Sequence, residues 1–160
     1  MNQNNKTMGD LSKYVNVSEV VTSVTAKRYG IDNTPNETQK ASLKLVCEMV
    51  FDKVREHFNT PIFIASGFRC EKLNTLVGGS KTSQHRVGEA LDIDADRYGK
   101  ITNKQIFDYI RQNLHFDQMI WEFGTNENPE WVHVSYRAKG NRNSCIRAKK
   151  VNGKTIYENI

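Results

Sequence analysis

The sequence predicts an α+β domain in which a small antiparallel sheet packs against N-terminal helices. Two observations predict this fold class. Helical periodicity dominates the first third of the chain, and short segments of alternating polarity, interrupted by one further helix, follow it. The length of 160 residues suits a single domain, and no internal repeat or low-complexity segment divides the chain.

Two helices are expected before the first strand. The segment NVSEVVTSVTAKRYG, residues 16–30, places valines on one side of a helix that Ser18 can cap. The second helix opens with Thr34 as its N-cap and Glu37 at the third helical position, which is a capping box. Apolar residues at helical spacing continue this second helix to about Phe58.

The strands are expected in four short apolar segments, with one helix among them. Thr102 and Gln105 form another capping box, which starts a helix that runs to about Leu114. The four strand segments are PIFIASGFR (61–69), GEALDIDA (88–95), FDQMIWEFG (116–124) and EWVHVSY (130–136).

Two histidines and one aspartate form a candidate metal site. Alternation puts Asp92 and His133 on one face of their strands, and Cβ atoms paired across adjacent antiparallel strands lie about 5 Å apart. His85 stands in the loop before the Asp92 strand, and Gly88 lets that loop turn back toward the same point. Three such ligands with a fourth position left for water are the layout of a catalytic zinc site.

Further residues are candidates for the chemistry around that site. A general base is expected at Glu130, three residues before His133 in the strand entrance, with Glu122 at the end of the preceding strand as the alternative. Arg69 is the candidate cation for an oxyanion or a substrate carboxylate. Ser83 is expected to donate a hydrogen bond behind the ligands or to shape their loop.

Some nearby residues have a simpler interpretation. Asp94 and Asp96 could ligate a metal by the same logic, but turn capping or binding of water is the preferred interpretation for both. Trp121 and Trp131 are expected in the core, with a substrate platform as the alternative.

Positive charge is concentrated at the C-terminal end. The net charge is +5, whereas residues 137–160 contain seven basic residues and one acidic residue, net +6, which leaves −1 for the residues before them. We therefore expect a loose N-terminus (1–10), a folded domain (11–137) and a basic tail (138–160). The tail is either simply solvated or binds an anionic polymer. A nucleic acid is not expected, because no basic helix carries interleaved aromatic residues.

The sequence lacks the features of a membrane or exported protein. No apolar run is long enough for a transmembrane helix, and the first ten residues, MNQNNKTMGD, contain no apolar stretch of a signal peptide. We expect synthesis in the cytoplasm, reduced cysteines and a monomer. A function outside the cell would then need release by another route.

Three motifs together resemble the zinc D-alanyl-D-alanine carboxypeptidase family, which shares its metal site with hedgehog-type domains. The family pattern S-x-H-x-x-G-x-A-x-D is similar to SQHRVGEALD, its later E-x-x-H to EWVH, and its S-G-[FY]-R to SGFR. The segment YGIDNTPN resembles the small cell-wall-peptidase subfamily. The resemblance covers roughly residues 11–137 and implies Zn²⁺ ligands at His85, Asp92 and His133, a base at Glu130 and a substrate contact at Arg69. A glutamate at the position of Glu122 is also regular in the small subfamily.

The resemblance also implies a function. It indicates a zinc peptidase that cuts amide bonds of peptidoglycan stem peptides or cross-links, as a carboxypeptidase or endopeptidase. A phage endolysin or virion-associated lysin, released by a holin or delivered with the virion, is the expected context. The basic tail would then rest on the anionic cell wall or membrane surface. The alternative is a non-catalytic, zinc-stabilised module of the cell wall or the virion.

Overall fold

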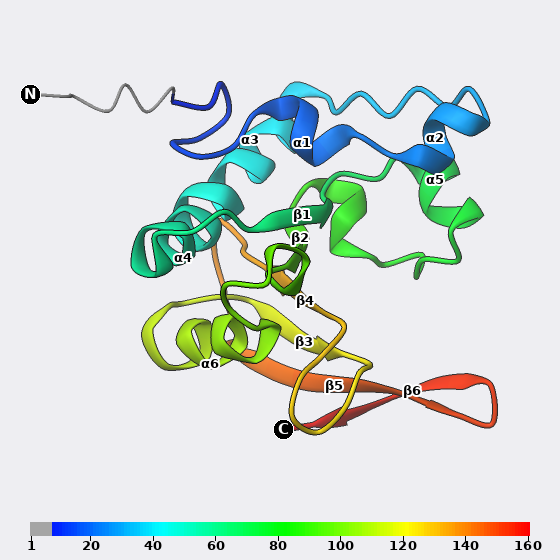
Figure 1. Cartoon of the computed structure of the whole chain (residues 1–160). Helices are drawn as coiled ribbons and strands as arrows, with labels where there is room; N and C mark the ends of the chain where they lie inside the picture. Colours follow the sequence, from blue (N-terminus) through cyan, green and yellow to red (C-terminus); the bar gives the residue numbers. More distant parts are fainter. Residues whose placement is uncertain (1–7) are drawn as a thin grey trace, which may run out of the picture.

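A computed structural model, which describes residues 8–160, confirms the α+β class. One six-stranded sheet has the strand order β1-β2-β4-β3-β5-β6, and helices lie along one side of it and beyond its first edge (Figure 1). The strands are β1 (Phe63–Ser66), β2 (Ala90–Asp94), β3 (Gln118–Glu122), β4 (Trp131–Ser135), β5 (Ser144–Val151) and β6 (Lys154–Asn159).

The helices follow the predicted order with three differences. The helix expected over 16–30 is two short helices, the one expected over 34–58 starts at Glu37, and a short helix that was not predicted follows β1. The helices are α1 (Val17–Val21), α2 (Val24–Arg28), α3 (Glu37–Val46), a π-helical turn (Cys47–Phe51), α4 (Asp52–Phe58), α5 (Glu71–Leu76) and α6 (Asn103–Asn113).

Side chains that compete for backbone donors explain the shifted helix starts. Ser23 accepts a hydrogen bond from the backbone N–H of Ala26, so it ends the first helical segment and caps α2. Asn16, not Ser18, is the N-cap of α1. Asn36 forms the capping box of α3 with Gln39, two residues beyond the predicted pair.

The two faces of the sheet have different roles. The core face carries the alternate apolar residues of the central strands, which pack with α3, α4 and α6. The Phe107 ring of α6, for example, meets Trp121 edge-on at 5.3 Å between centroids. The opposite face carries Asp92 paired with His133, and His133 paired with Ile120. Polar residues of the strands therefore gather on the face that the core leaves free.

The prediction of a basic tail is wrong, because residues 144–159 form two strands of the sheet. β5 pairs in parallel with β3, and β6 pairs antiparallel with β5. Several basic side chains of residues 137–160 also make specific contacts. Arg142 binds Asp117 through two hydrogen bonds, and Arg147 lies over the Trp121 ring. The boundary expected at residue 137 does not separate a tail from the fold.

At the other end, the expected loose segment falls mostly outside the described residues, which begin at residue 8. Asp10 is ordered by contacts: its carboxylate accepts from the N–H of Val17 at 2.6 Å, and its own N–H donates to Asn16 at 3.1 Å. Asp10 is thus part of the start of α1.

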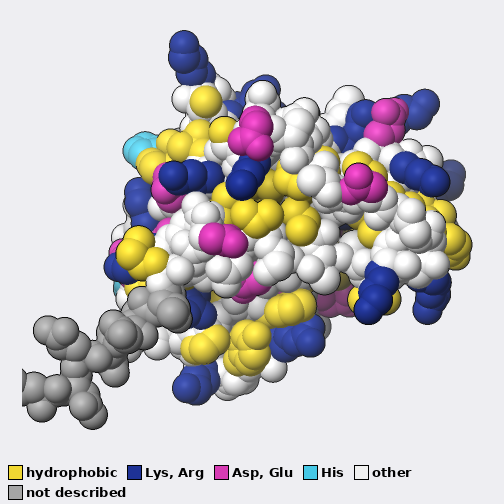
Figure 2. All heavy atoms as spheres, turned by 90° about the horizontal axis from the view of Figure 1, so that it is seen from above, with side chains coloured by type: hydrophobic (Ala, Val, Ile, Leu, Met, Phe, Trp, Pro, Cys, Tyr) yellow, Lys and Arg dark blue, Asp and Glu magenta, His cyan; other side chains and the backbone are white. Residues whose placement is uncertain are grey.

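The surface seen from the side of the N-terminal helices is mixed in character. Figure 2 shows small hydrophobic patches separated by polar side chains, with lysines and arginines distributed around the face. Within residues 8–160, none of the helices combines the length and apolarity that a membrane crossing requires.

Candidate metal centre and active site

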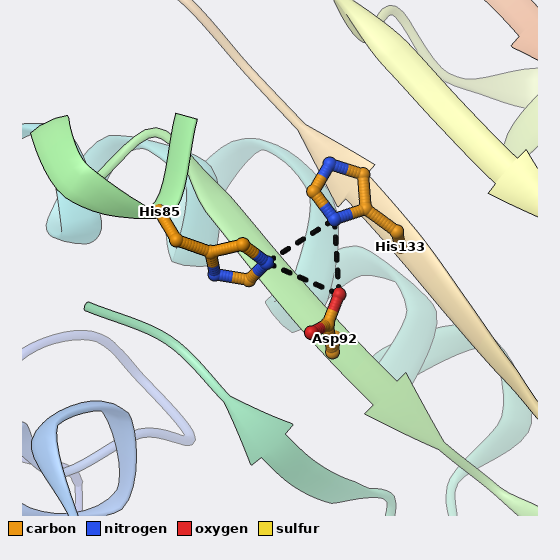
Figure 3. Close-up of side chains that lie close together, drawn as sticks. All are labelled: His85, Asp92 and His133. Atoms are coloured by element: carbon orange, nitrogen blue, oxygen red, sulfur yellow. Dashed lines mark hydrogen bonds and ion pairs between the residues drawn. The ribbon is translucent and has the colours of Figure 1, made fainter. Parts of the chain in front are cut away.

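The structure brings His85, Asp92 and His133 to one point (Figure 3). His85 Nε2 lies 3.2 Å from Asp92 Oδ1 and 3.2 Å from His133 Nδ1, and His133 Nδ1 lies 2.9 Å from Asp92 Oδ1. Ligands bound to one tetrahedral zinc at about 2.05 Å are separated by about 3.3 Å. The three atoms thus have nearly the spacing that a zinc ion requires.

The hydrogen bonding of His85 also fits a cation. Its Nδ1 lies 2.6 Å from the Gly67 carbonyl oxygen, which can only accept, so Nδ1 carries the proton. When Nε2 carries no proton, it presents a lone pair to the Asp92 carboxylate, itself an acceptor. Two acceptors that face each other in a buried place need a proton or a metal cation between them. The donor set of two imidazoles and one carboxylate suits Zn²⁺.

Strand register and one tight turn create this geometry. Asp92 and His133 are direct partners in the β2–β4 pairing, so their side chains project from the same face. His85 lies in a short 3₁₀ turn whose last residue is followed by Gly88 at φ +78°. A Cβ at Gly88 would collide with the backbone oxygen of Gln39. Glycine therefore lets the loop pass close to α3 and return His85 to the sheet, as predicted.

Asp92 is ionised in this environment. Burial opposes its ionisation, but the hydrogen bonds of His85 and His133, and the positive charge of these rings when they are protonated, outweigh burial and hold the pKa of Asp92 well below its usual range. A carboxylate is the form that a metal ligand requires.

The two candidate bases are placed differently. Glu122 lines the cleft around His85, Asp92 and His133, whereas Glu130 is exposed and lines a neighbouring hollow. Burial and the charge of Asp92 raise the pKa of Glu122 to about 7, although His133 and Arg69 act in the opposite direction. The structure thus favours Glu122, contrary to the preference for Glu130 in the sequence analysis.

Backbone pairing explains that reversal. Glu122 lies two residues from Ile120, which pairs with His133, so Glu122 projects from the same face as the ligands. Glu130 stands just before β4 and donates its backbone N–H to the Glu122 carbonyl at 2.9 Å. Glu130 lies in the loop before β4, as a base at this position would need. Its side chain, however, lines the neighbouring hollow and not the cleft that contains His85, Asp92 and His133.

Arg69, which follows β1, lines the same cleft, whereas Glu122 lies at the end of β3. Burial lowers the pKa of Arg69, while the charges of Asp92 and Glu122 act to raise it. Its Nε is buried without a hydrogen-bond partner, and its guanidinium forms no ion pair among residues 8–160. Arg69 is therefore available for an anionic group of a ligand.

Asn33, which the sequence analysis did not single out, holds the Arg69 segment in place. Its Nδ2 donates to the carbonyls of Val21 and Phe68 at 2.8 and 2.9 Å, and its Oδ1 accepts from the N–H of Cys70 at 2.8 Å. The buried amide thereby fixes both residues that flank Arg69. Asn33 belongs to the segment YGIDNTPN, which carried part of the family resemblance.

The loop that carries His85 is fixed on its other side. Ser83 Oγ accepts from the His85 N–H at 3.3 Å, so Ser83 shapes the loop and does not contact a ligand side chain. Asp117 is buried and accepts from Gln84 at 3.0 Å and from Arg142 at 2.8 Å. Burial opposes ionisation of Asp117, but these hydrogen bonds outweigh it and lower its pKa. Asp117 was missed because its partner Arg142 lies in the segment expected to be a tail.

The structure also places the aspartate and the two tryptophans that had simpler interpretations. Asp94 bonds to Asn103 at 3.1 Å and to the N–H of Asp96 at 3.1 Å, which is the predicted turn-capping role. Trp121 is buried in the core, as expected, but Trp131 lines the cleft.

Comparison with known proteins agrees with this site. The family model described as Peptidase M15 matches residues 13–135, a segment that includes all three candidate ligands, Glu122 and Arg69. No curated protein matches the chain at a significant level. Because the matched segment covers well over half of the chain, the protein belongs to the Peptidase M15 family, which is of the zinc D-alanyl-D-alanine carboxypeptidase type.

Proposed function

We propose that the protein is a zinc-dependent peptidase that hydrolyses amide bonds in peptidoglycan stem peptides or their cross-links. The observation that carries the proposal is the convergence of His85, Asp92 and His133 in a cleft that also contains Glu122. Its volume of about 550 Å³ is suitable for a short peptide segment. The family membership supports a peptidase on a substrate of this type.

The chain's own residues have distinct roles in the proposal. His85, Asp92 and His133 would hold Zn²⁺, which, when bound, supplies Lewis acidity and a water of lowered pKa. Glu122 accepts a proton from the attacking water and delivers it to the leaving amine. Arg69 binds a substrate carboxylate or the developing oxyanion with its free guanidinium donors.

The biological setting is a further part of the proposal. An endolysin or virion-associated lysin is favoured by the resemblance of the motifs to the small cell-wall-peptidase subfamily. The excess of positive charge over residues 137–160 supports contact with an anionic wall or membrane surface. We expect the protein to act as a monomer.

The test is mass spectrometry of the peptides released from purified peptidoglycan by zinc-loaded and by chelated protein. A product that forms only with zinc supports the proposal, and its mass identifies the bond that is cut. Stoichiometric zinc binding without any product from several wall types would instead support the non-catalytic module.

A further inference from the structure

A group of aromatic residues and one lysine surrounds Glu122 on the side of the cleft away from Arg69. We call this group the aromatic–lysine subsite; its members are Phe123, Trp131, Lys150 and Tyr157, all of which line the cleft. Lys150 and Tyr157 belong to the β5–β6 hairpin, which lies outside the segment that matches the family model. Lys150 and Tyr157 therefore extend the cleft beyond the matched segment, whereas Phe123 and Trp131 lie within it.

Strand register places the tyrosine. Glu122 pairs with Ala148 of β5, and Ala148 pairs with Tyr157 of β6, so all three project from the same face. Because the side chain of Ala148 is a single methyl group, no large side chain separates Glu122 from Tyr157 across these strands. Burial and the charge of Glu122 raise the pKa of the Tyr157 phenol, which agrees with this proximity. Tyr157 is nevertheless 59% exposed, so most of its ring is free to contact a ligand.

The backbone of Phe123 has a left-handed conformation, which is uncommon for a bulky residue. Phe123 has φ +53° and is followed by Gly124 at φ +69°. A bulky residue rarely adopts this left-handed conformation, which costs of order 1 kcal/mol or more. Regular alternation would send its ring to the face opposite Glu122, but instead the ring lines the cleft and meets Trp131 at 5.5 Å between centroids. The left-handed backbone of Phe123 therefore places its ring beside Trp131 in the cleft.

Lys150 supplies a positive charge at this wall. Its Nζ bonds to Thr155 Oγ1 at 2.8 Å and lies 5.4 Å from the centre of the Phe123 ring. No carboxylate in residues 8–160 lies within ion-pair distance of Lys150, whereas the adjacent Lys149 is paired with Glu158. Lys150 and Arg69 are the lysine and the arginine that line the cleft. They come from opposite ends of the strand order, because Lys150 lies in β5 and Arg69 follows β1.

We propose that the aromatic–lysine subsite binds the part of the substrate that flanks the scissile amide and carries a free carboxylate. The carboxylate lies against Lys150, and the peptide backbone or side chain packs on Tyr157 and Trp131. The inference deepens the proposed function and rests on it, because it assigns one side of the same cleft. Together with Arg69, the subsite favours peptides with a negative charge on each side of the cut bond.

The test measures binding of two synthetic stem peptides by calorimetry with zinc-loaded protein. The peptides differ only in one group, which is a free D-isoglutamate carboxylate in the first and its amide in the second. Tyr157→Ala should weaken binding of both peptides about three- to tenfold. Lys150→Gln should remove a preference for the carboxylate of about two- to fivefold, which should also shrink at high salt.

Matched controls are available on the other side of the same hairpin. Ile156 neighbours Tyr157 in β6 but projects from the opposite face, and Lys154 is an exposed lysine on that face. Ile156→Ala and Lys154→Gln should leave both affinities within about twofold of the wild type. Zinc content and the thermal midpoint of every variant establish that the fold is intact.

Two measurements separate this inference from the proposed function. Equal affinities for the wild type, Tyr157→Ala and Lys150→Gln, or no binding of either peptide, would overturn the subsite even if peptidoglycan is cleaved. Conversely, Tyr157-dependent and Lys150-dependent binding without any hydrolysis would support the subsite while the proposed enzymatic activity fails. In a cleaving protein, the Tyr157 effect should appear in KM, with kcat nearly unchanged.

Discussion

Replacement of Glu122 by glutamine tests the assignment of the general base. Glutamine keeps the size and hydrogen-bonding capacity of the side chain but cannot accept the proton. Glu122 lies in the cleft with the three candidate ligands, and its pKa of about 7 is close to the value that suits proton transfer at neutral pH. Proton transfer by a positioned group contributes about 10²- to 10⁴-fold, or about 3–5 kcal/mol. We therefore expect kcat to fall at least about 100-fold.

The assay is the initial rate of peptide release from soluble muropeptides, with zinc content measured on the same samples. Glu122 is not among the three converging ligands, so Glu122→Gln should retain stoichiometric zinc. Glu130→Gln is the matched control, because Glu130 is exposed in the neighbouring hollow, and its rate should stay within about twofold of the wild type. The reasoning is refuted if Glu130→Gln abolishes turnover while Glu122→Gln retains it.

Four further outcomes are expected. His85→Ala should lose stoichiometric zinc and the thermal stabilisation that zinc gives, measured by metal analysis and by unfolding with and without chelator. Asp117→Asn should cost about 2–3 kcal/mol in urea unfolding, because a buried charged acceptor is lost. Gly88→Ala should lower the thermal midpoint and zinc affinity together, since φ is +78° and Gln39 blocks the added methyl group. In metal-free protein, burial and Asp92 raise the folded-state pKa of Glu122, so stability should fall as pH rises from about 4.3 toward about 7. Glu122→Gln should reduce this slope in urea unfolding at pH 5 and pH 8, and an unchanged slope would contradict the assigned environment.

The candidate metal ligands could be located from sequence because the information is local. Alternation in ALDID and WVHVS fixes which face each residue takes, and only one pairing was needed to join Asp92 with His133. Gly88 identified the turn that returns His85. The candidate base could not be assigned in this way. Whether Glu122 or Glu130 faces the candidate ligands depends on how β3 pairs with β4 and on the path of the loop between them. Spacing does not reveal this tertiary pairing.

The hairpin at the C-terminus was missed although the sequence contains a signal for it. Asn152 and Gly153 both have positive φ, at +50° and +76°, as a two-residue turn between antiparallel strands requires. The pair Asn-Gly between two alternating segments indicates such a turn. The basic residues of β5 obscured this pattern, because Lys149 and Lys150 suggested a charged tail and not two consecutive residues of a strand. Arg142 was likewise assigned to a tail, so its buried partner Asp117 had no apparent role.

The position of the second histidine depends on residues that never meet the substrate. Val132 and Val134 flank His133 and are fully buried on the core face. A slip of β4 by one residue would move both valines into the cleft and His133 into the core, and would also separate His133 from Asp92. Burial of each valine is worth about 1.5–3 kcal/mol, so such a slip would cost several kcal/mol before any ligand is considered. The hydrophobic pattern of β4 therefore sets the geometry of the candidate metal centre, and the same alternation through β3, β5 and β6 carries Glu122 and Tyr157 to the cleft.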